Sequence, residues 1–237
     1  MKEETYLQIF DEICREDEED ILRICSVASQ KLNDLLKLPF DDPRLVGVIF
    51  SKTFDAILDE LKDSEQKNSG CELNICNRLA IGYTTTASDE EEKSGNFMIY
   101  INHKSTETHY ESSDEVMGKE SKDLCVEWNT SNIRDNPSAI QRIQAIAVDK
   151  LRKIDVIIGG KDIIMPVFIM TYESLIDVIK IRRQETKEFE YEINFLSCFN
   201  VTARETEDGD SEISIRPNIN AKLTIKSDKI ASSQYDD

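Results

Sequence analysis

The stretch from Lys187 to Lys226 decides how this chain is built, because its apolar residues recur at every second position. Before the acidic segment Glu207–Asp210, the odd positions are apolar except for Ser197; they are Phe189, Tyr191, Ile193, Phe195, Phe199, Val201 and Ala203. After that segment the odd positions are apolar again: Ile213, Ile215, Pro217, Ile219, Ala221, Leu223 and Ile225. Such alternation predicts two half-buried strands joined by a turn. We therefore expect a long C-terminal β-hairpin over residues 187–226.

The register of this hairpin follows from the numbering of its apolar residues. All of them are odd, so directly paired residues must have numbers with an even sum; a slip of one residue would turn one apolar face outward. A three-residue loop at 208–210 satisfies this condition and predicts three pairs: Phe199 with Ile219, Phe195 with Leu223, and Ile193 with Ile225. A five-residue loop satisfies it equally well, and the pattern does not separate the two.

The length of the predicted strands raises the question of a partner. Strands of about 16 residues span on the order of 50 Å, whereas a domain of this size has a radius of gyration of about 18 Å. Either the hairpin bends, at Ser197 or Pro217, or it projects as an arm. A projecting arm with one apolar face would need a partner, most simply a second copy of the chain. Its candidate interface residues are Phe199, Val201, Ala203, Ile213 and Ile215.

Composition narrows the classes of function. The chain has 237 residues, 39% of them hydrophobic, and a formal net charge of −18. A strongly acidic chain is a poor general binder of nucleic acid or anionic membranes, whose affinity comes from neutralising phosphates. No apolar run is long enough for a membrane span, and Met1-Lys2-Glu3-Glu4 is too acidic for a signal peptide. We expect a cytoplasmic protein with no strong nucleic-acid binding and no membrane association.

Cysteine and histidine give no metal-site pattern. The six cysteines fit buried, reduced thiols, and the spacing of Cys71 and Cys76 is not that of a zinc site. His103, Glu107 and His109 share one polar loop, but their spacing matches neither a helical nor a finger-type metal motif. We expect no metal ligands and no cofactor.

Taken in order, the chain predicts an α+β fold. It divides into an N-terminal helical segment (1–66), an α+β domain with the long hairpin (67–228) and a polar tail (229–237), expected to form one compact unit. The apolar spacing predicts three antiparallel helices in the first segment. Further predictions are a hairpin over 73–83 and 97–101, a strand over 124–128, helices over 136–151 and 171–183, and strands over 154–158 and 163–170 joined at Gly159-Gly160. We expect N-terminal helices followed by a mainly antiparallel sheet with two flanking helices, and no internal repeat.

Two stretches of the sequence resemble catalytic motifs, but each also has a simpler structural explanation. Gly159-Gly160-Lys161-Asp162 contains the glycine and lysine of a phosphate-binding loop, but Asp162 stands where a magnesium-binding hydroxyl is needed, so a turn is favoured. Asp177, Glu185 and Lys187 could hold a metal ion and assist a water molecule, as in metal-dependent nucleases. In a chain with 32% charged residues such spacing arises easily by chance. We assign no catalytic residue.

The densest basic cluster consists of Lys180, Arg182 and Arg183. At the end of a predicted helix, such residues interact with the last backbone carbonyls. The alternative is an ion-pair contact with an acidic stretch of a neighbouring copy, either 16–20 or 89–92, which makes the three residues interface candidates.

The chain resembles neck and tail proteins of tailed bacteriophages, which join helices to a sheet with extended hairpins and assemble as rings around the DNA passage. The resemblance is carried by Phe189–Ala203, Ile213–Ile225, the acidic balance and the acidic loop 88–94. It implies a non-enzymatic structural protein that forms a homo-oligomeric ring or connector with other assembly proteins in the host cytoplasm and virion. Because the first quarter of the chain is largely helical, the resemblance does not say which ring of the neck or tail the chain would form. The alternatives are a metal-dependent nuclease-like enzyme and an acidic regulatory module that binds a basic protein.

Overall fold

The first quarter of the chain forms three amphipathic helices, as its apolar spacing predicts. They are α1 (Glu3–Ile13), α2 (Glu18–Leu36) and α3 (Pro43–Glu65). Lys37 takes a left-handed backbone conformation (φ 53°) at the end of α2. The Asp42 carboxylate accepts the Arg44 N–H at 3.0 Å just before α3 begins. This computed structural model describes residues 3–14, 17–65, 71–76, 78–86, 94–101, 120–186, 190–205 and 211–218.

The middle of the chain is mostly helical and contains none of the three strands predicted there. It contains α4 (Ser121–Asn132), α5 (Pro137–Arg152), a short 3₁₀ helix η2 (Lys161–Ile163) and α6 (Ile164–Thr186). The strand predicted at 124–128 is wrong: Leu124 and Trp128 lie on the buried side of α4, one turn apart, while Val126 is 44% exposed. The strands predicted at 154–158 and 163–170 are also wrong. Residues 164–170 are all buried in α6, and a continuous apolar run does not distinguish a helix from a strand.

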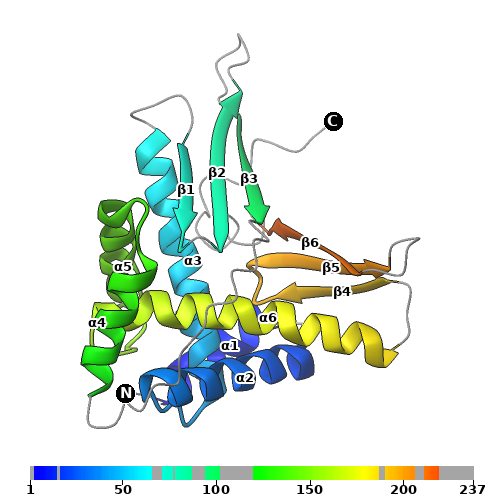
Figure 1. Cartoon of the computed structure of the whole chain (residues 1–237), viewed down its shortest axis with the longest axis horizontal. Helices are drawn as coiled ribbons and strands as arrows, with labels where there is room; N and C mark the ends of the chain where they lie inside the picture. The colour runs from blue at the N-terminus through cyan, green and yellow to red at the C-terminus, as the bar shows by residue number, and fades with distance from the viewer. Residues whose placement is uncertain are drawn as a thin grey trace.

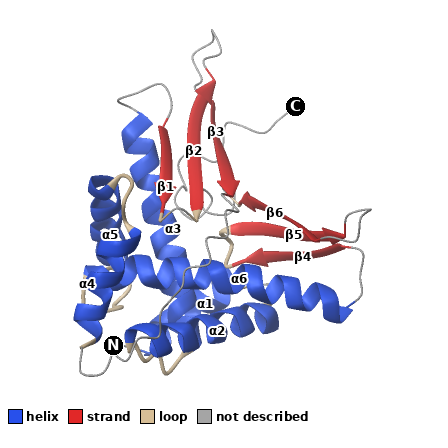
Figure 2. Cartoon of the chain, in the orientation of Figure 1, coloured by secondary structure: helices blue, strands red, loops and turns tan. Residues whose placement is uncertain are grey.

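Two three-stranded antiparallel sheets follow the two sets of helices. The first contains β1 (Cys71–Ile75), β2 (Leu79–Thr86) and β3 (Ser94–Ile101); the second contains β4 (Glu190–Phe195), β5 (Phe199–Glu205) and β6 (Ser211–Pro217). Figure 2 shows the sheets together on one side of the molecule and most of the helices on the other. The α+β class and the N-terminal helices are confirmed, but the single sheet is in fact two.

The long hairpin predicted over 187–226 has an extra reversal within its first strand. The chain turns at Leu196 and Ser197, both with φ 52°, and the Cys198 N–H donates to the Phe195 carbonyl at 2.9 Å. The chain therefore reverses at Ser197, one of the two positions where a bend was expected. Three residues separate the paired Phe195 and Phe199, so apolar residues keep their odd numbers on both sides of the turn. The alternation in the sequence therefore gives no sign of this turn.

The even-sum rule for pairing is confirmed, but the specific pairs are not. Ile215 lies opposite Val201 and Ile213 opposite Ala203, whereas Phe199 faces Pro217 instead of Ile219. The pairs predicted for Phe195 and Ile193 are wrong too, because these residues face Phe199 and Val201. Glu205 pairs with Ser211, which corresponds to the longer of the two predicted loops. Residues 219–226 lie outside the described part of the chain.

The same order of elements, three helices followed by three strands, occurs twice: from α1 to β3 and, interrupted only by η2, from α4 to β6. The sequences match where the elements match. Residues 21–32 and 140–151 both read I-x-R-I-x-x-V/I-A-x-x-K-L. In α3 and α6 the matching residues are Phe50 and Phe168, Thr53 and Thr171, Asp59 and Asp177, and Lys62 and Lys180. The expectation of no internal repeat is wrong; the matches are scattered, and connections of different length separate them.

The two halves share one hydrophobic core. α2 packs along α6, and α5 packs along α3, so helices of each half lie against helices of the other. Figure 1 shows α3 with β1–β3 and α6 with β4–β6 on opposite sides of a diagonal across the view. The matching rings of Phe50 and Phe168 stack with centroids 4.6 Å apart. Helices before residue 66 therefore share their core with the helices that follow.

Candidate functional site

Most of the apolar residues predicted to form an interface are buried inside the chain. Phe199, Val201, Ala203 and Ile215 belong to its core, and Ile213 is half-buried against that core. The Phe199 ring lies 4.7 Å from that of Phe54 on α3. In the described part of the hairpin, the apolar face therefore packs inside its own chain.

The predicted contact between the basic cluster and the acidic run 16–20 exists, but within one chain. Arg182 Nε donates to Asp20 Oδ1 at 2.6 Å, and the Tyr191 hydroxyl donates to Asp20 Oδ2. Asp17 accepts the backbone N–H of Asn194 at 3.0 Å, which occupies a donor on the outer edge of β4. Lys180 is exposed, whereas Arg183 is almost fully buried. The acidic run thus fastens α2 to α6 and β4, and the stretch 89–92 lies outside the described residues.

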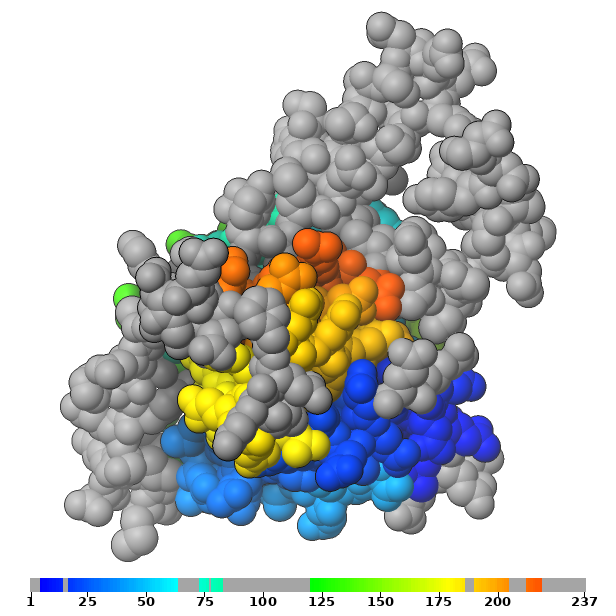
Figure 3. All heavy atoms as spheres, turned by 90° about the vertical axis from the view of Figure 1, so that its right-hand side faces the viewer, coloured from blue at the N-terminus to red at the C-terminus, as the bar shows by residue number. Residues whose placement is uncertain are grey.

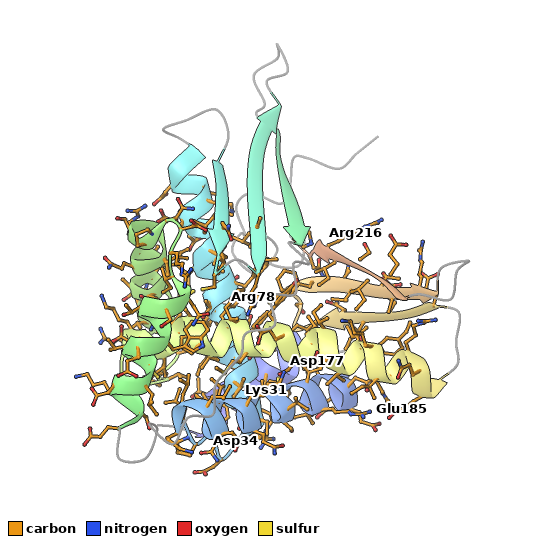
Figure 4. All side chains as sticks on the ribbon, in the orientation of Figure 1. Lys31, Asp34, Arg78, Asp177, Glu185 and Arg216 are labelled. Atoms are coloured by element: carbon orange, nitrogen blue, oxygen red, sulfur yellow. The ribbon has the colours of Figure 1, made fainter. Side chains whose placement is uncertain are left out.

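Two of the residues in the nuclease hypothesis form ion pairs between helices. Asp177 binds Lys31 of α2 at 2.8 Å, and Glu185 binds Arg23 of α2 at 3.1 Å. Hydrogen bonding by Arg23 lowers the pKa of Glu185. Figure 4 shows Lys31, Asp177 and Glu185 where α2 and α6 run together. Four further candidates lie outside the described residues: Lys187, His103, Glu107 and His109. Within the described part of the chain, no group of three or more acidic, histidine or cysteine side chains could hold a metal ion.

A hollow lined by several charged side chains lies on the described surface. It lies on the face of β4–β6 that points away from α6, which we call the outer face, and it encloses about 370 Å³. Its lining residues are Glu190, Glu192, Thr202, Arg204, Glu212, Ser214 and Arg216. Figure 4 places Arg216 on the side of β6 away from α6, and Figure 3 shows the second sheet, in orange, above α6 and α2.

The strand register arranges these charges in rows across the sheet. Glu190, Arg204 and Glu212 are directly opposite one another, and Arg204 donates to Glu190 at 2.8 and 2.9 Å. Glu192, Thr202 and Ser214 form the next row, and Arg216 lies opposite Asn200 beyond it. Opposite charges across a sheet contribute only modestly to stability. The alternation implies that the even-numbered residues of the hairpin face away from the core, but it did not select these residues. Their cross-strand charge pairing becomes visible only once the register is known.

The sheets β1–β3 and β4–β6, which are the two copies of the repeated sheet, carry similar residues on their inner faces and mostly different residues on their outer faces. The inner positions Val201, Ile213 and Ile215 correspond by register to Ile81, Phe97 and Ile99, which are also apolar. On the outer face, three charged residues of the second sheet correspond to uncharged ones in the first: Arg204 to Thr84, Glu212 to Asn96, and Arg216 to Tyr100. Glu192 differs from these three, because Glu72 occupies the corresponding position of the first sheet. Core packing explains the agreement of the inner faces. Arg204, Glu212 and Arg216 are therefore not needed to build a sheet of this kind, because the first sheet forms without charges at the corresponding positions.

The buried thiols are poor nucleophiles at neutral pH. Burial raises the pKa of Cys125 to about 11 and the pKa values of Cys14 and Cys76 to about 12, and it raises that of Cys25 further. The thiolate is the reactive form. The five cysteines whose side chains the structure describes are buried and take part in no disulfide, so they serve as core residues.

These raised pKa values predict that the protein loses stability at alkaline pH. The folded state holds the thiol protons more tightly than the unfolded chain, in which a cysteine titrates near about pH 8.5. The buried thiols therefore contribute their full stabilisation below about pH 8, and this stabilisation is lost as the pH rises toward the pKa values of the folded state. We expect the melting temperature to be nearly constant from about pH 6.5 to 8 and to fall steadily above about pH 9.

The control for this prediction is Cys25→Ala, which removes one buried thiol. This variant should be less stable at every pH because of the cavity, but its melting temperature should fall less steeply above about pH 9. An unchanged slope in Cys25→Ala would show that other groups cause the alkaline loss.

No protein-family model, curated protein or solved structure matches the chain. Among the described residues, no helix has the length and apolar character needed to cross a membrane. The candidate site therefore stands on its geometry and on the comparison of the two copies.

Proposed function

We propose that this chain is a non-enzymatic assembly protein that binds a basic protein partner on the outer face of β4–β6. The observation that carries the proposal is a set of charges on this face: Arg204, Glu212 and Arg216 appear in one sheet and have no charged counterpart in the other. Residues that a fold does not require and that line an open hollow are available for recognition. Three glutamates and two arginines give the hollow a mixed but net acidic character.

Charge favours a basic partner over a second copy of the same chain. The net charge of −18 attracts positively charged proteins over long range and raises their rate of encounter. The same charge repels identical copies. The apolar residues expected to join copies, such as Phe199 and Val201, are buried. A homo-oligomeric ring, and a place in the neck or tail of a phage virion, remain predictions that need another contact surface.

The alternative of a metal-dependent enzyme receives less support from the described residues. Asp177 and Glu185 belong to separate ion pairs with α2, and using them to hold a metal ion would break the contacts that join α2 to α6. Magnesium-dependent nuclease activity that is lost in Glu185→Ala would support the enzyme instead.

The proposal is tested by binding to a synthetic peptide of alternating lysine and serine. Glu192→Gln/Glu212→Gln removes two carboxylates from the hollow and keeps the shape of the side chains. The matched control, Glu18→Gln/Glu19→Gln, makes the same change in net charge at exposed positions of α2. We expect the hollow variant to bind the peptide about tenfold more weakly, a loss of about 1.4 kcal/mol, while the control loses less than about twofold.

Fluorescence anisotropy titrations at low and moderate salt measure both affinities. Equal losses for the two variants would mean that the peptide responds only to total charge, and would overturn the outer face as the binding site. Light scattering at several protein concentrations checks the second part of the proposal. A monomer throughout is expected, and a stable ring without a partner would contradict the preference for a basic partner.

A further inference from the structure

The ion pairs between the two halves follow a reciprocal pattern. Lys31 of α2 binds Asp177 of α6 at 2.8 Å, and Lys150 of α5 binds Asp59 of α3 at 2.7 Å. Lys31 corresponds to Lys150 and Asp177 to Asp59 when the two halves are aligned. Each half therefore contributes one lysine and one aspartate, and both pairs run from one half to the other. In a twofold interface, if a residue of the first unit contacts a given residue of the second, the corresponding residue of the second unit contacts the corresponding residue of the first.

The centre of the molecule follows the same rule. On a twofold axis a residue meets its own counterpart, and Phe50 stacks on the corresponding Phe168 with an angle of 14° between the rings. β3 likewise lies beside β6, its counterpart in the other sheet. Local details repeat as well: the Thr53 hydroxyl donates to the Ile49 carbonyl at 2.8 Å, and the Thr171 hydroxyl donates to the Val167 carbonyl at 2.7 Å.

The buried faces that join the halves also match position by position. α2 buries Ile21, Ile24, Ala28 and Leu32, and α5 buries Ile140, Ile143, Ala147 and Leu151. α2 packs along α6 in the other half, and α5 packs along α3. The sheets add a smaller contact between the halves, because β3 lies beside β6. The surface that each half presents is thus complementary to a unit of its own kind.

We infer that the chain is a fused dimer. The contact between its halves is a self-association surface of one α-α-α-β-β-β unit, and the partner that this surface fits is a second copy of the unit, supplied by the same chain. The inference is independent of the proposed binding on the outer face. It extends that proposal in one respect, because it explains how one sheet can keep the fold while the other acquires charges.

If the two halves are related by a twofold axis, the connection from the first half to the second and a connection from the second half back to the first should be equivalent. The chain passes from Ile101, at the end of β3, to Ser121, at the start of α4. The equivalent path runs from Pro217, at the end of β6, to Glu3, at the start of α1. Residues 218–237 joined to Met1 supply about as many residues as the existing connection, 102–120, and a connection of that length can reach on the order of 60 Å. The order of the halves should therefore be interchangeable.

A circular permutant tests this inference with the whole chain. It begins at residue 120, joins Asp237 directly to Met1 and ends at residue 119. We expect the same circular dichroism spectrum as the original protein and a melting temperature within about 5 °C of it. Affinity for the lysine–serine peptide should be unchanged, because the outer face is intact.

A second permutant with a long glycine–serine insertion at the new joint is the comparison. If only this version folds, the two connections are not equivalent and the twofold relation is wrong. If neither version folds, the halves depend on their order in the chain and are not interchangeable, which overturns the inference as well. Failure of peptide binding in a folded permutant would instead count against the outer face as the binding site.

Discussion

Replacing Phe50 by alanine should lower the free energy of unfolding by about 3–5 kcal/mol, the usual cost of removing a fully buried phenylalanine. The Phe50 ring contacts Phe168, Phe195 and Phe199, with centroid distances of 4.6, 5.2 and 5.9 Å. It is fully buried, so the deletion leaves a cavity where both halves meet. Phe168→Ala should cost a similar amount, since Phe168 is the corresponding residue of the other half and is also fully buried.

Urea unfolding of the two single variants and the double variant measures this effect. The two costs should not add: a coupling of about 0.5–1.5 kcal/mol is expected for a stacked aromatic pair. Phe40→Ala is the control, because Phe40 is only partly buried, and it should cost less than either core variant. Additive effects of Phe50→Ala and Phe168→Ala would show that the two rings are not in contact in solution.

Replacing Asp20 by alanine should lower the free energy of unfolding by about 2–4 kcal/mol, because two charge-assisted hydrogen bonds are lost and their donors remain partly buried. Asp20 accepts from Arg182 Nε at 2.6 Å and from the Tyr191 hydroxyl. It thereby joins α2 to α6 and to β4. Burial and this hydrogen bond raise the pKa of Tyr191, so the neutral phenol is the form present at neutral pH.

Thermal and urea unfolding of Asp20→Asn and Glu19→Ala separate the effect of the Asp20 charge from the effect of removing any acidic residue from this part of α2. Asp20→Asn keeps one acceptor without the charge and should show an intermediate loss. Glu19 is an exposed acidic neighbour on α2, and its replacement should change stability by less than about 0.5 kcal/mol. If Asp20→Ala cost no more than Glu19→Ala, the acidic run would not fasten α2 to the second half.

Amphipathic periodicity was enough to predict the helices of the first quarter. In α2 the buried residues Ile21, Ile24, Ala28 and Leu32 recur every three or four positions. One face of a helix determines this pattern locally, whatever it packs against. The start of α3 at Pro43 was equally readable, because proline favours the first turn of a helix.

The two tight hairpins could not be read from alternation. In both of them three residues lie between the paired strand ends, at Ile75–Leu79 and at Phe195–Phe199, and such a turn keeps the odd–even pattern intact. Leu196, Ser197 and Cys76 have positive φ, a conformation that glycine and asparagine usually signal. Residues 196–198 include neither glycine nor asparagine, so the usual turn signal is missing from the second hairpin. The first has Asn77 between its paired ends, but the alternation from Leu73 to Tyr83 favoured a single strand.

The candidate site shows a different limit of sequence reasoning. Alternation correctly separated the inner from the outer positions of β4–β6, but it could not say what covers the inner face. Val201 and Ile215 were candidates for an interface with a partner, whereas both are buried in the core of their own chain. The outer face became a candidate only after the register aligned its charges and the second sheet supplied a comparison.

Amide hydrogen exchange with and without the lysine–serine peptide tests the central proposal most directly, because it locates the bound partner along the chain. Exchange should slow in β4–β6, around Glu192, Thr202 and Ser214, and should be unchanged in β1–β3 and in the first turn of α2. Protection confined to the acidic first turn of α2, or equal protection of both sheets, would contradict the assignment of the outer face as the binding surface.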